Sequence, residues 1–190
     1  MRGYTVIELV LMLAVVAGLT HLATSNLPEW VARHRADSSL QGLRSTINFA
    51  RHAAIVRQQT VVVCPDATPN RRQASGCGSR DTWHLGTLVF ADRTRNRRLD
   101  PDDDVLRRLP GIPDGHIYWR AFRSRSYLVF TPSGITDWQN GHLLYCPTNQ
   151  DPRLARQLIL NFAGRTYPSR DANGDGVHEN HRGKPLFCPS

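Results

Sequence analysis

The sequence predicts an α+β fold in which a long N-terminal helix packs on an antiparallel β-sheet globular domain. Two observations carry this prediction. An apolar N-terminal run passes into an amphipathic helix, and the rest of the chain holds strand-forming segments separated by short connections rich in Gly and Pro. Connections this short leave no room for the crossover helices that parallel strands need, so we expect antiparallel pairing.

The apolar run begins at Tyr4, and between Leu9 and Leu19 it holds no charged or strongly polar residue. A helix of about 20 such residues matches the thickness of a bilayer core. We therefore expect a transmembrane helix over residues 4–27. Glu8 is the exception, because a carboxylate in hydrocarbon costs about 2.5–3.5 kcal/mol or more and indicates a function with a partner. A cleaved secretory signal and a plain single-span anchor both leave Glu8 unexplained.

An amphipathic helix is expected over residues 28–58. Its apolar positions are spaced three and four residues apart, which marks one helix face. These positions are Leu40, Leu43, Ile47, Ala50 and Ala54. We expect one helix from residue 4 to about residue 56, loosened near residues 24–26 by Pro28, with its second half lying across a sheet.

A β-rich domain is expected over residues 59–190. Its strand candidates are residues 60–64, 83–90, 105–109, 116–122, 127–130, 142–146 and 156–162. The last two form a hairpin, and the tail from Gly164 is polar and rich in Gly.

All four cysteines lie beyond the membrane segment, and an even number in an exported domain indicates disulfides. The sequence alone leaves three pairings open. A bond from Cys64 to Cys77 would close a loop and contribute about 3 kcal/mol, and one from Cys146 to Cys188 would tie down the tail. Arg2 favours an N-terminus inside the cell, which places the domain outside the cytoplasm.

The formal net charge of +8 and the pI near 10 favour an anionic partner such as nucleic acid, lipid headgroups or an acidic protein face. Lys184 is the only lysine, so the alternative is that the arginine-rich composition reflects a GC-rich genome.

Residues 3–9, Gly-Tyr-Thr-Val-Ile-Glu-Leu, closely resemble the class III signal of type IV pilins. The resemblance implies a leader of residues 1–3, cleavage between Gly3 and Tyr4 by a prepilin peptidase, and methylation of the new amine on Tyr4, where the family usually has Phe. Glu8 matches the glutamate at the fifth mature position.

Within the pilin-like proteins, the chain resembles the FimT/GspH family of minor pilins and pseudopilins. The resemblance lies in six short segments and in their order along the chain. They are residues 43–58, 61–65, 85–92, 99–107, 130–134 (Phe-Thr-Pro-Ser-Gly) and 161–166, which contains Gly164-Arg165. The resemblance implies a type IV pilin-like fold and a role in assembly and binding, not in catalysis.

The family resemblance also implies the partners: other pilins or pseudopilins through the N-terminal helix, the prepilin peptidase and the inner membrane. Glu8 is expected to meet the N-terminal amine of an adjacent subunit, since each charge needs a partner in hydrocarbon. We expect a single-pass inner-membrane protein with a periplasmic C-terminal domain, later part of a pilus or pseudopilus. The first interpretation is a minor pilin of a type IV pilus, and the alternative is a type II secretion pseudopilin.

Some FimT-type minor pilins bind DNA during natural transformation, and this chain resembles them around Gly164. The candidate DNA-binding residues are Arg165, Tyr167, Arg170, Arg182 and Lys184. Arginines pair with phosphates and an aromatic ring can stack on bases, in contacts that depend on salt and not on sequence. The alternative is a solvated surface loop.

No cofactor is expected unless calcium binds the tail. Asp171, Asn173 and Asp175 stand at positions one, three and five of a calcium-type loop, followed by a glycine. Arg182 occupies the twelfth position, so Glu179 would have to replace the missing carboxylate, and the alternative is a simple Asn/Gly turn.

A second acidic segment, residues 92–104, is interleaved with arginines, so internal ion pairs are expected there instead of a metal. The chain contains no nucleophile elbow, phosphate loop or metalloprotease motif, which argues against an enzyme.

Overall fold

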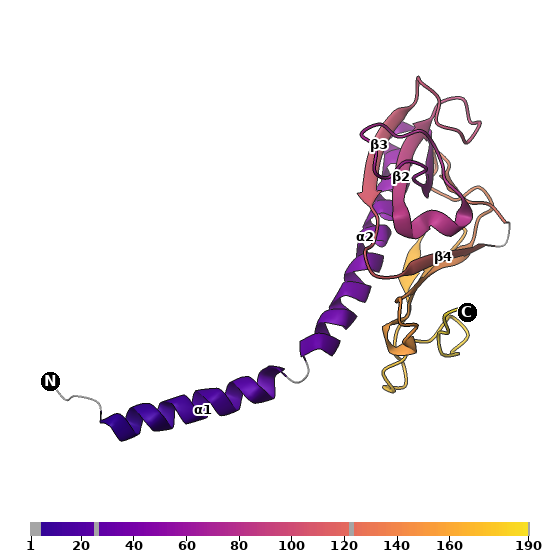
Figure 1. Cartoon of the computed structure of the whole chain (residues 1–190). Helices are drawn as coiled ribbons and strands as arrows, with labels where there is room; N and C mark the ends of the chain where they lie inside the picture. Colours follow the sequence, from indigo (N-terminus) through magenta and orange to yellow (C-terminus); the bar gives the residue numbers. More distant parts are fainter. Residues whose placement is uncertain (1–4, 25–26, 122–123, 190) are drawn as a thin grey trace. The chain divides into compact units, whose positions relative to one another are not determined.

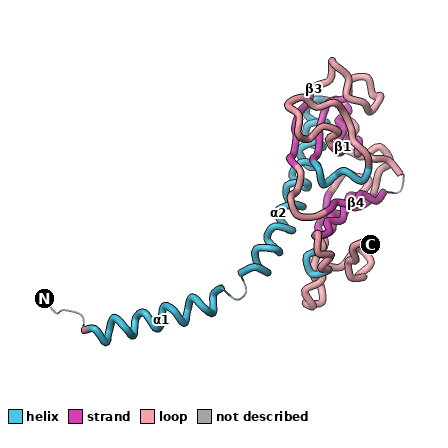
Figure 2. The backbone as a smooth tube through the Cα atoms, in the orientation of Figure 1, coloured by secondary structure: helices cyan, strands magenta, loops and turns pink. Residues whose placement is uncertain are grey.

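The computed structural model describes residues 5–24, 27–121 and 124–189. The chain divides into two compact units, residues 1–35 and residues 36–190, and each is described by itself. Figure 1 shows the elements in chain order, and Figure 2 separates helices from strands.

Two helices are present in the N-terminal part of the chain. Helix α1 spans Val6–Thr24 and helix α2 spans Leu27–Arg57, where the sequence predicted one helix loosened near residues 24–26. Pro28 stands in the first turn of α2, where its missing N–H needs no partner within the helix. In the next turn Arg33 forms an ion pair of 2.6 Å with Glu29, one helical turn away.

The remainder of the chain is built from eight strands and two short 3₁₀ helices among the described residues. The strands are β1 (Thr60–Pro65), β2 (Gly86–Asp92), β3 (Asp104–Pro110), β4 (His116–Ala121), β5 (Leu128–Phe130), β6 (Gly141–Cys146), β7 (Arg156–Leu160) and β8 (Thr166–Pro168). The 3₁₀ helices are η1 (Arg80–Leu85) and η2 (Pro152–Leu154).

The strands form two antiparallel sheets, with the orders β3-β2-β1-β5 and β4-β6-β7-β8. In the first sheet Val62 of β1 lies between Phe90 of β2 and Val129 of β5. In the second sheet β6 and β7 form the predicted hairpin, with Leu143 opposite Leu158. The prediction of antiparallel pairing is confirmed, and the strands divide between two sheets.

The largest apolar cluster joins α2 to both sheets. The stripe predicted from the sequence is buried along its whole length, from Leu40 to Ala54, and Ala36 extends it by one turn. It packs against side chains such as Val63 of the first sheet and Leu158 of the second. The strand-forming segments therefore bury their apolar faces on one helix, and burial supplies most of the driving force for this arrangement.

Three segments differ from the predicted elements. Residues 83–85 belong to η1 and not to a strand, because Trp83 turns inward and packs on Trp119 with ring centroids 6.2 Å apart. Strand β7 ends at Leu160, two residues early, where a tight turn at Asn161 begins. Strand β8 lies in the polar, Gly-rich tail, where the sequence predicted no strand, and it forms by backbone pairing with β7.

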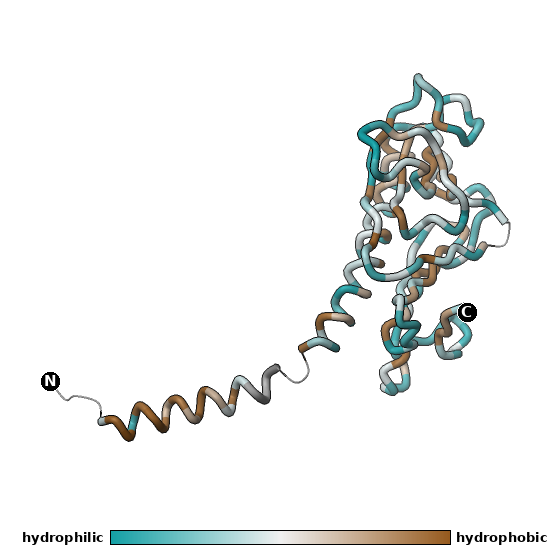
Figure 3. Tube along the Cα trace, viewed as in Figure 1, coloured by the Kyte–Doolittle hydropathy of each residue, from teal (hydrophilic) through white to brown (hydrophobic). Residues whose placement is uncertain are grey.

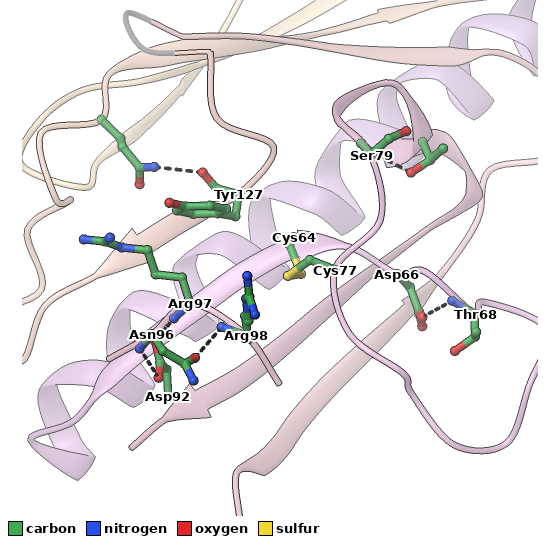
Figure 4. Close-up of a disulfide and its surroundings, with 12 residues drawn as sticks. Cys64, Asp66, Thr68, Cys77, Ser79, Asp92, Asn96, Arg97, Arg98 and Tyr127 are labelled. Atoms are coloured by element: carbon green, nitrogen blue, oxygen red, sulfur yellow. Dashed lines mark hydrogen bonds between the residues drawn. A yellow bond between two sulfur atoms is a disulfide. The ribbon is translucent and has the colours of Figure 1, made fainter. Parts of the chain in front are cut away.

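Both disulfides described as options from the sequence are formed, and the described residues contain no free cysteine. Cys64 bonds Cys77 and closes the loop after β1, where the Asp66 carboxylate accepts the Thr68 N–H at 2.8 Å (Figure 4). Cys146 bonds Cys188 and fixes the tail to the end of β6.

Candidate functional site

Helix α1 presents an apolar surface on all sides. The side chains from Val6 to Leu19 are exposed, including Leu9 at 58% and Leu13 at 61%. Figure 3 colours most of α1 brown, for hydrophobic residues. A helix that is apolar all round is stable where it is surrounded by other apolar groups, in a protein interior or in a membrane. This surface therefore needs partners from outside the chain.

Glu8 caps the beginning of α1. Its carboxylate accepts hydrogen bonds from the backbone N–H of Thr5 at 2.9 Å and from the Thr5 hydroxyl at 3.1 Å. The Thr5 hydroxyl in turn accepts the Glu8 N–H at 3.4 Å, which completes a reciprocal capping box. Glu8 thus has a local partner in the isolated chain, besides the intersubunit role that the resemblance implies for it.

The other N-terminal predictions are not decided by the structure. Gly3 and Tyr4, the residues of the predicted processing site, lie outside the described residues. Within the described part of the chain, no helix has the length and apolar character needed to cross a membrane. The transmembrane assignment of residues 4–27 stays a prediction.

Three of the family-like segments meet at one junction on α2. Arg51 donates from Nε to the carbonyl oxygen of Gly134 at 2.9 Å. Gly134 and Gly164 both have positive φ, of 77° and 74°. A Cβ on Gly164 would lie 2.6 Å from the Gly134 oxygen, so only glycine fits. The segment that contains Gly164-Arg165 is therefore first of all a close-packed part of the fold.

Beyond this junction the chain places all five candidate DNA-binding residues at the surface. Arg165, Tyr167 and Arg170 follow one another along and just after the edge strand β8. Isolated bridges join Arg170 to Glu179 and Glu179 to Pro185, so the segment that carries Arg182 and Lys184 folds back beside Arg170. None of the four basic side chains forms an ion pair with another described residue.

The tail also brings together the residues predicted as calcium ligands. Carboxylate oxygens of Asp171, Asp175 and Glu179 lie within 4.8 Å of one another. Asn173 takes part in the same turn, where its side-chain oxygen accepts the Asp175 N–H at 3.0 Å. Both predicted features of the tail, the basic set and the acidic set, therefore occupy the same small region.

The acidic segment of residues 92–104 is arranged differently. Buried Asp92 accepts the N–H groups of Asn96 and Arg97, at 3.2 Å and 2.7 Å. Arg93 forms the predicted kind of internal ion pair with Asp104 at 3.0 Å, whereas Arg97 reaches out of the segment to Asp137, also at 3.0 Å. In the described part of the chain no metal-type cluster forms here.

A helix followed by antiparallel sheets, with family motifs converging on that helix, defines a type IV pilin-like protein. Two solved structures share this fold. The type IV minor pilin FimU of Pseudomonas aeruginosa matches with a TM-score of 0.53 and 17% identity over 73% of this chain and 90% of that one. The minor pseudopilin EpsH of the Vibrio cholerae type 2 secretion system matches with a TM-score of 0.50 and 12% identity over 70% and 95%.

A comparison of the sequence with protein-family models identifies the family. The model of the family described as type II transport protein GspH matches residues 39–164. The chain belongs to this family, and its function is that of a pilin-type or pseudopilin-type subunit. A search of curated protein sequences found no match.

Two features of the site escaped prediction from the sequence. Thr5 and Glu8 have the spacing of a capping box, a signal that the apolar run obscured. The Arg51 junction links positions far apart in the chain, so no local pattern reveals it, although the glycines of both segments indicated special backbone positions.

Proposed function

We propose that this chain is a minor pilin of a type IV pilus that assembles through α1 and contacts DNA through its C-terminal segment. The observation that carries the assembly role is the exposed apolar surface of α1 with one carboxylate near its beginning. In this proposal the leader is removed between Gly3 and Tyr4, α1 holds the subunit in the inner membrane, and the domain from residue 59 lies in the periplasm.

Glu8 acts in assembly by pairing with the new N-terminal amine of a neighbouring subunit. Apolar packing of helices has little directional preference, whereas a carboxylate and an ammonium group in an apolar environment have a strong one. The pair therefore sets the register between subunits. The same glutamate caps its own helix, so the two roles must be separated by experiment.

The assembly role is tested by comparing Glu8→Ala with Thr5→Val in the intact cell. Thr5→Val removes the hydroxyl from the cap and leaves the carboxylate in place. We expect Glu8→Ala to remove the protein from sheared filaments, and Thr5→Val to reduce its amount only slightly, since a cap contributes about 1 kcal/mol. Equal losses in the two variants, with equal amounts of protein in the membrane, would reduce Glu8 to a capping residue.

A type II secretion pseudopilin is the second candidate, favoured by the description of the matching family. Deleting the gene distinguishes the pilus role from the secretion role. Loss of DNA uptake with normal protein secretion supports the pilus role, and the reverse result supports the pseudopilus role.

The DNA contact is supported by exposed Arg165 and Arg170 on either side of Tyr167, whose side chain is 47% exposed. Such a surface binds phosphates through arginine and stacks a base on the ring. Binding of the full chain in detergent to a mixed-sequence duplex tests this. Each lost phosphate contact reduces the slope of log K against log salt by about 0.9, so we expect Arg165→Ala/Arg170→Ala to reduce it by about 1.8.

A matched control variant is available on the loop closed by Cys64 and Cys77. Arg71→Ala/Arg72→Ala removes the same charge from two exposed arginines there. It should leave the salt slope unchanged. If both double variants change binding equally, the DNA contact is a property of net charge and not of the C-terminal segment.

A further inference from the structure

Three carboxylates converge at the turn of residues 171–179, and we propose that they bind one calcium ion. Oxygens of Asp171, Asp175 and Glu179 lie within 4.8 Å of one another, and no other group of this kind occurs among the described residues. Calcium binds oxygen at about 2.3–2.6 Å, so oxygens on opposite sides of one ion lie about 4.6–5.2 Å apart. The observed separation fits a single shared ion.

Glu179 supplies an independent reason for a cation. Its side chain is buried, with 8% of its surface exposed. One carboxylate oxygen, Oε2, accepts the Ala172 N–H at 2.8 Å, but the other, Oε1, has no hydrogen-bond partner. A buried carboxylate oxygen without a partner is costly. A cation between the three carboxylates would provide the missing interaction.

The backbone holds these carboxylates in place. Glu179 pairs with Arg170 in an isolated bridge, through a hydrogen bond of 2.9 Å from the Glu179 N–H. Asp171 accepts the N–H groups of Gly174 and Gly176 at 2.7 Å and 2.9 Å. These two hydrogen bonds fix the direction in which the Asp171 carboxylate points.

The cluster lacks charge compensation from the protein. In the described part of the chain, none of the three carboxylates forms an ion pair. His178 lies between them in the sequence, but its Nδ1 is within hydrogen-bond distance of the Ser169 hydroxyl, at 3.1 Å, and forms no ion pair with them. Three like charges at this separation repel one another, and a divalent cation relieves that repulsion.

The donor set selects calcium among the common cations. All the candidate ligands are oxygens, which calcium prefers, and the site offers no thiolate for a softer metal. Asn173 provides an amide oxygen at the third position, and the backbone carbonyl of Val177 stands at the seventh, as in calcium loops. Asp175 is exposed, so water can complete the coordination, which tolerates more ligands than the strict octahedron of magnesium.

Calorimetry with the full chain in detergent tests the site. After treatment with a chelator, titration with calcium chloride should show one ion per chain with a Kd of about 10⁻⁵–10⁻³ M, between the weakest sensor sites and the extracellular sites. Asp175→Asn should weaken binding at least about tenfold, because it removes one of three charged ligands while its exposed side chain has only local contacts. Magnesium chloride should bind at least about tenfold more weakly than calcium.

Two further variants keep the test decisive. Asp81→Asn removes one exposed carboxylate far from the turn in sequence, and its affinity for calcium should equal that of the parent. Glu179→Gln should abolish binding, with circular dichroism showing that the variant is folded. No binding by the parent at about 10 mM calcium, or the same affinity in Asp175→Asn as in the parent, would overturn the proposal. These measurements involve neither filament assembly nor DNA, so they stand apart from the tests of the proposed function.

Discussion

The segments 92–104 and 171–179 are both rich in aspartate. A carboxylate of the first forms an ion pair within the segment, whereas those of the second form none among the described residues. In the first, Asp103 accepts the Arg93 N–H at 2.9 Å and Asp104 pairs with the Arg93 side chain. In the second, three carboxylates face one another without a cationic partner among the described residues. The presence of several acidic residues alone does not distinguish the two segments.

The difference lies in the positions of the arginines and of the backbone N–H groups. In residues 92–104 four arginines precede the acidic residues between 100 and 104, the Arg93 side chain returns to Asp104, and backbone N–H groups bond to Asp92 and Asp103. In residues 171–179 no arginine or lysine intervenes, and Arg170 and Arg182 stand outside the turn. An acidic cluster therefore becomes a candidate cation site only when its own chain leaves the charge uncompensated.

The two disulfides should affect the two acidic segments separately, and this is the largest effect that we expect. The Cys146–Cys188 bond spans a sequence separation of 42 and the Cys64–Cys77 bond one of 13. In the chain-entropy model they contribute about 4 and about 3 kcal/mol. Replacing Cys146 and Cys188 by alanine should speed hydrogen exchange of amides 171–179 and leave 92–104 unchanged.

The matched control is the replacement of Cys64 and Cys77 by alanine. These cysteines pack in one apolar cluster with Leu99, so amides 92–104 should exchange faster and those of 171–179 should not change. Mass spectrometry after timed exchange measures both segments at once. Equal acceleration of both segments in either variant would show that they unfold as one unit.

Asp92→Ala tests whether the first segment depends on its own hydrogen bonds. The substitution removes a buried carboxylate that accepts two backbone N–H groups, so we expect a loss of about 2–3 kcal/mol in the free energy of unfolding. Urea denaturation measures it, with the exposed Asp102→Ala as a control expected to stay within about 0.5 kcal/mol of the parent. A loss below about 0.5 kcal/mol for Asp92→Ala would mean that water replaces the carboxylate.

The smallest effect concerns pH and Asp171. Its folded pKa lies below its unfolded value, so its contribution to stability is present above the unfolded pKa of about 3.9 and is lost as the pH falls through the folded pKa. Carboxyl NMR of the calcium-free chain should show Asp171 titrating below the ordinary value for aspartate. An Asp171 pKa at or above the ordinary aspartate value would contradict this expectation.

Much of the fold could be predicted from sequence because its signals are local. The spacing of Leu40, Leu43 and Ile47 shows a helix face directly, and the β-branched run at residues 60–64 shows a strand. The division into two sheets could not be predicted in this way, because it depends on which strands pair across long separations. Strand β5 returning to β1 is the decisive example.

The residue types of the candidate site could be predicted from the sequence, but the positions of their side chains in space could not. The spacing of Asp171, Asn173 and Asp175 is visible in the sequence, but the burial of Glu179 depends on bridges to Arg170 and Pro185. The basic residues near Arg165 were also visible. Their neighbour Gly164 serves packing against Gly134, which only the folded chain reveals.

The edge strands of the two sheets determine how readily two molecules of this protein could pair strand to strand. Exposed strand edges invite pairing with another chain, and proteins counter this with short edges, proline, charge or a covering element. In the described sheets, edge strands β5 and β8 have only three residues each, and β8 ends in Pro168. Each edge strand therefore has few backbone N–H and C=O groups available for pairing with a strand of another molecule.

The longer edges are blunted by other means. Strand β3 carries Arg107 and Arg108 and ends in Pro110. The 3₁₀ helix η1 packs beside β4, where His84 contacts His116 with ring centroids 4.5 Å apart. In the proposed function, these blunted edges limit strand pairing between globular domains, and α1 makes the contacts between subunits.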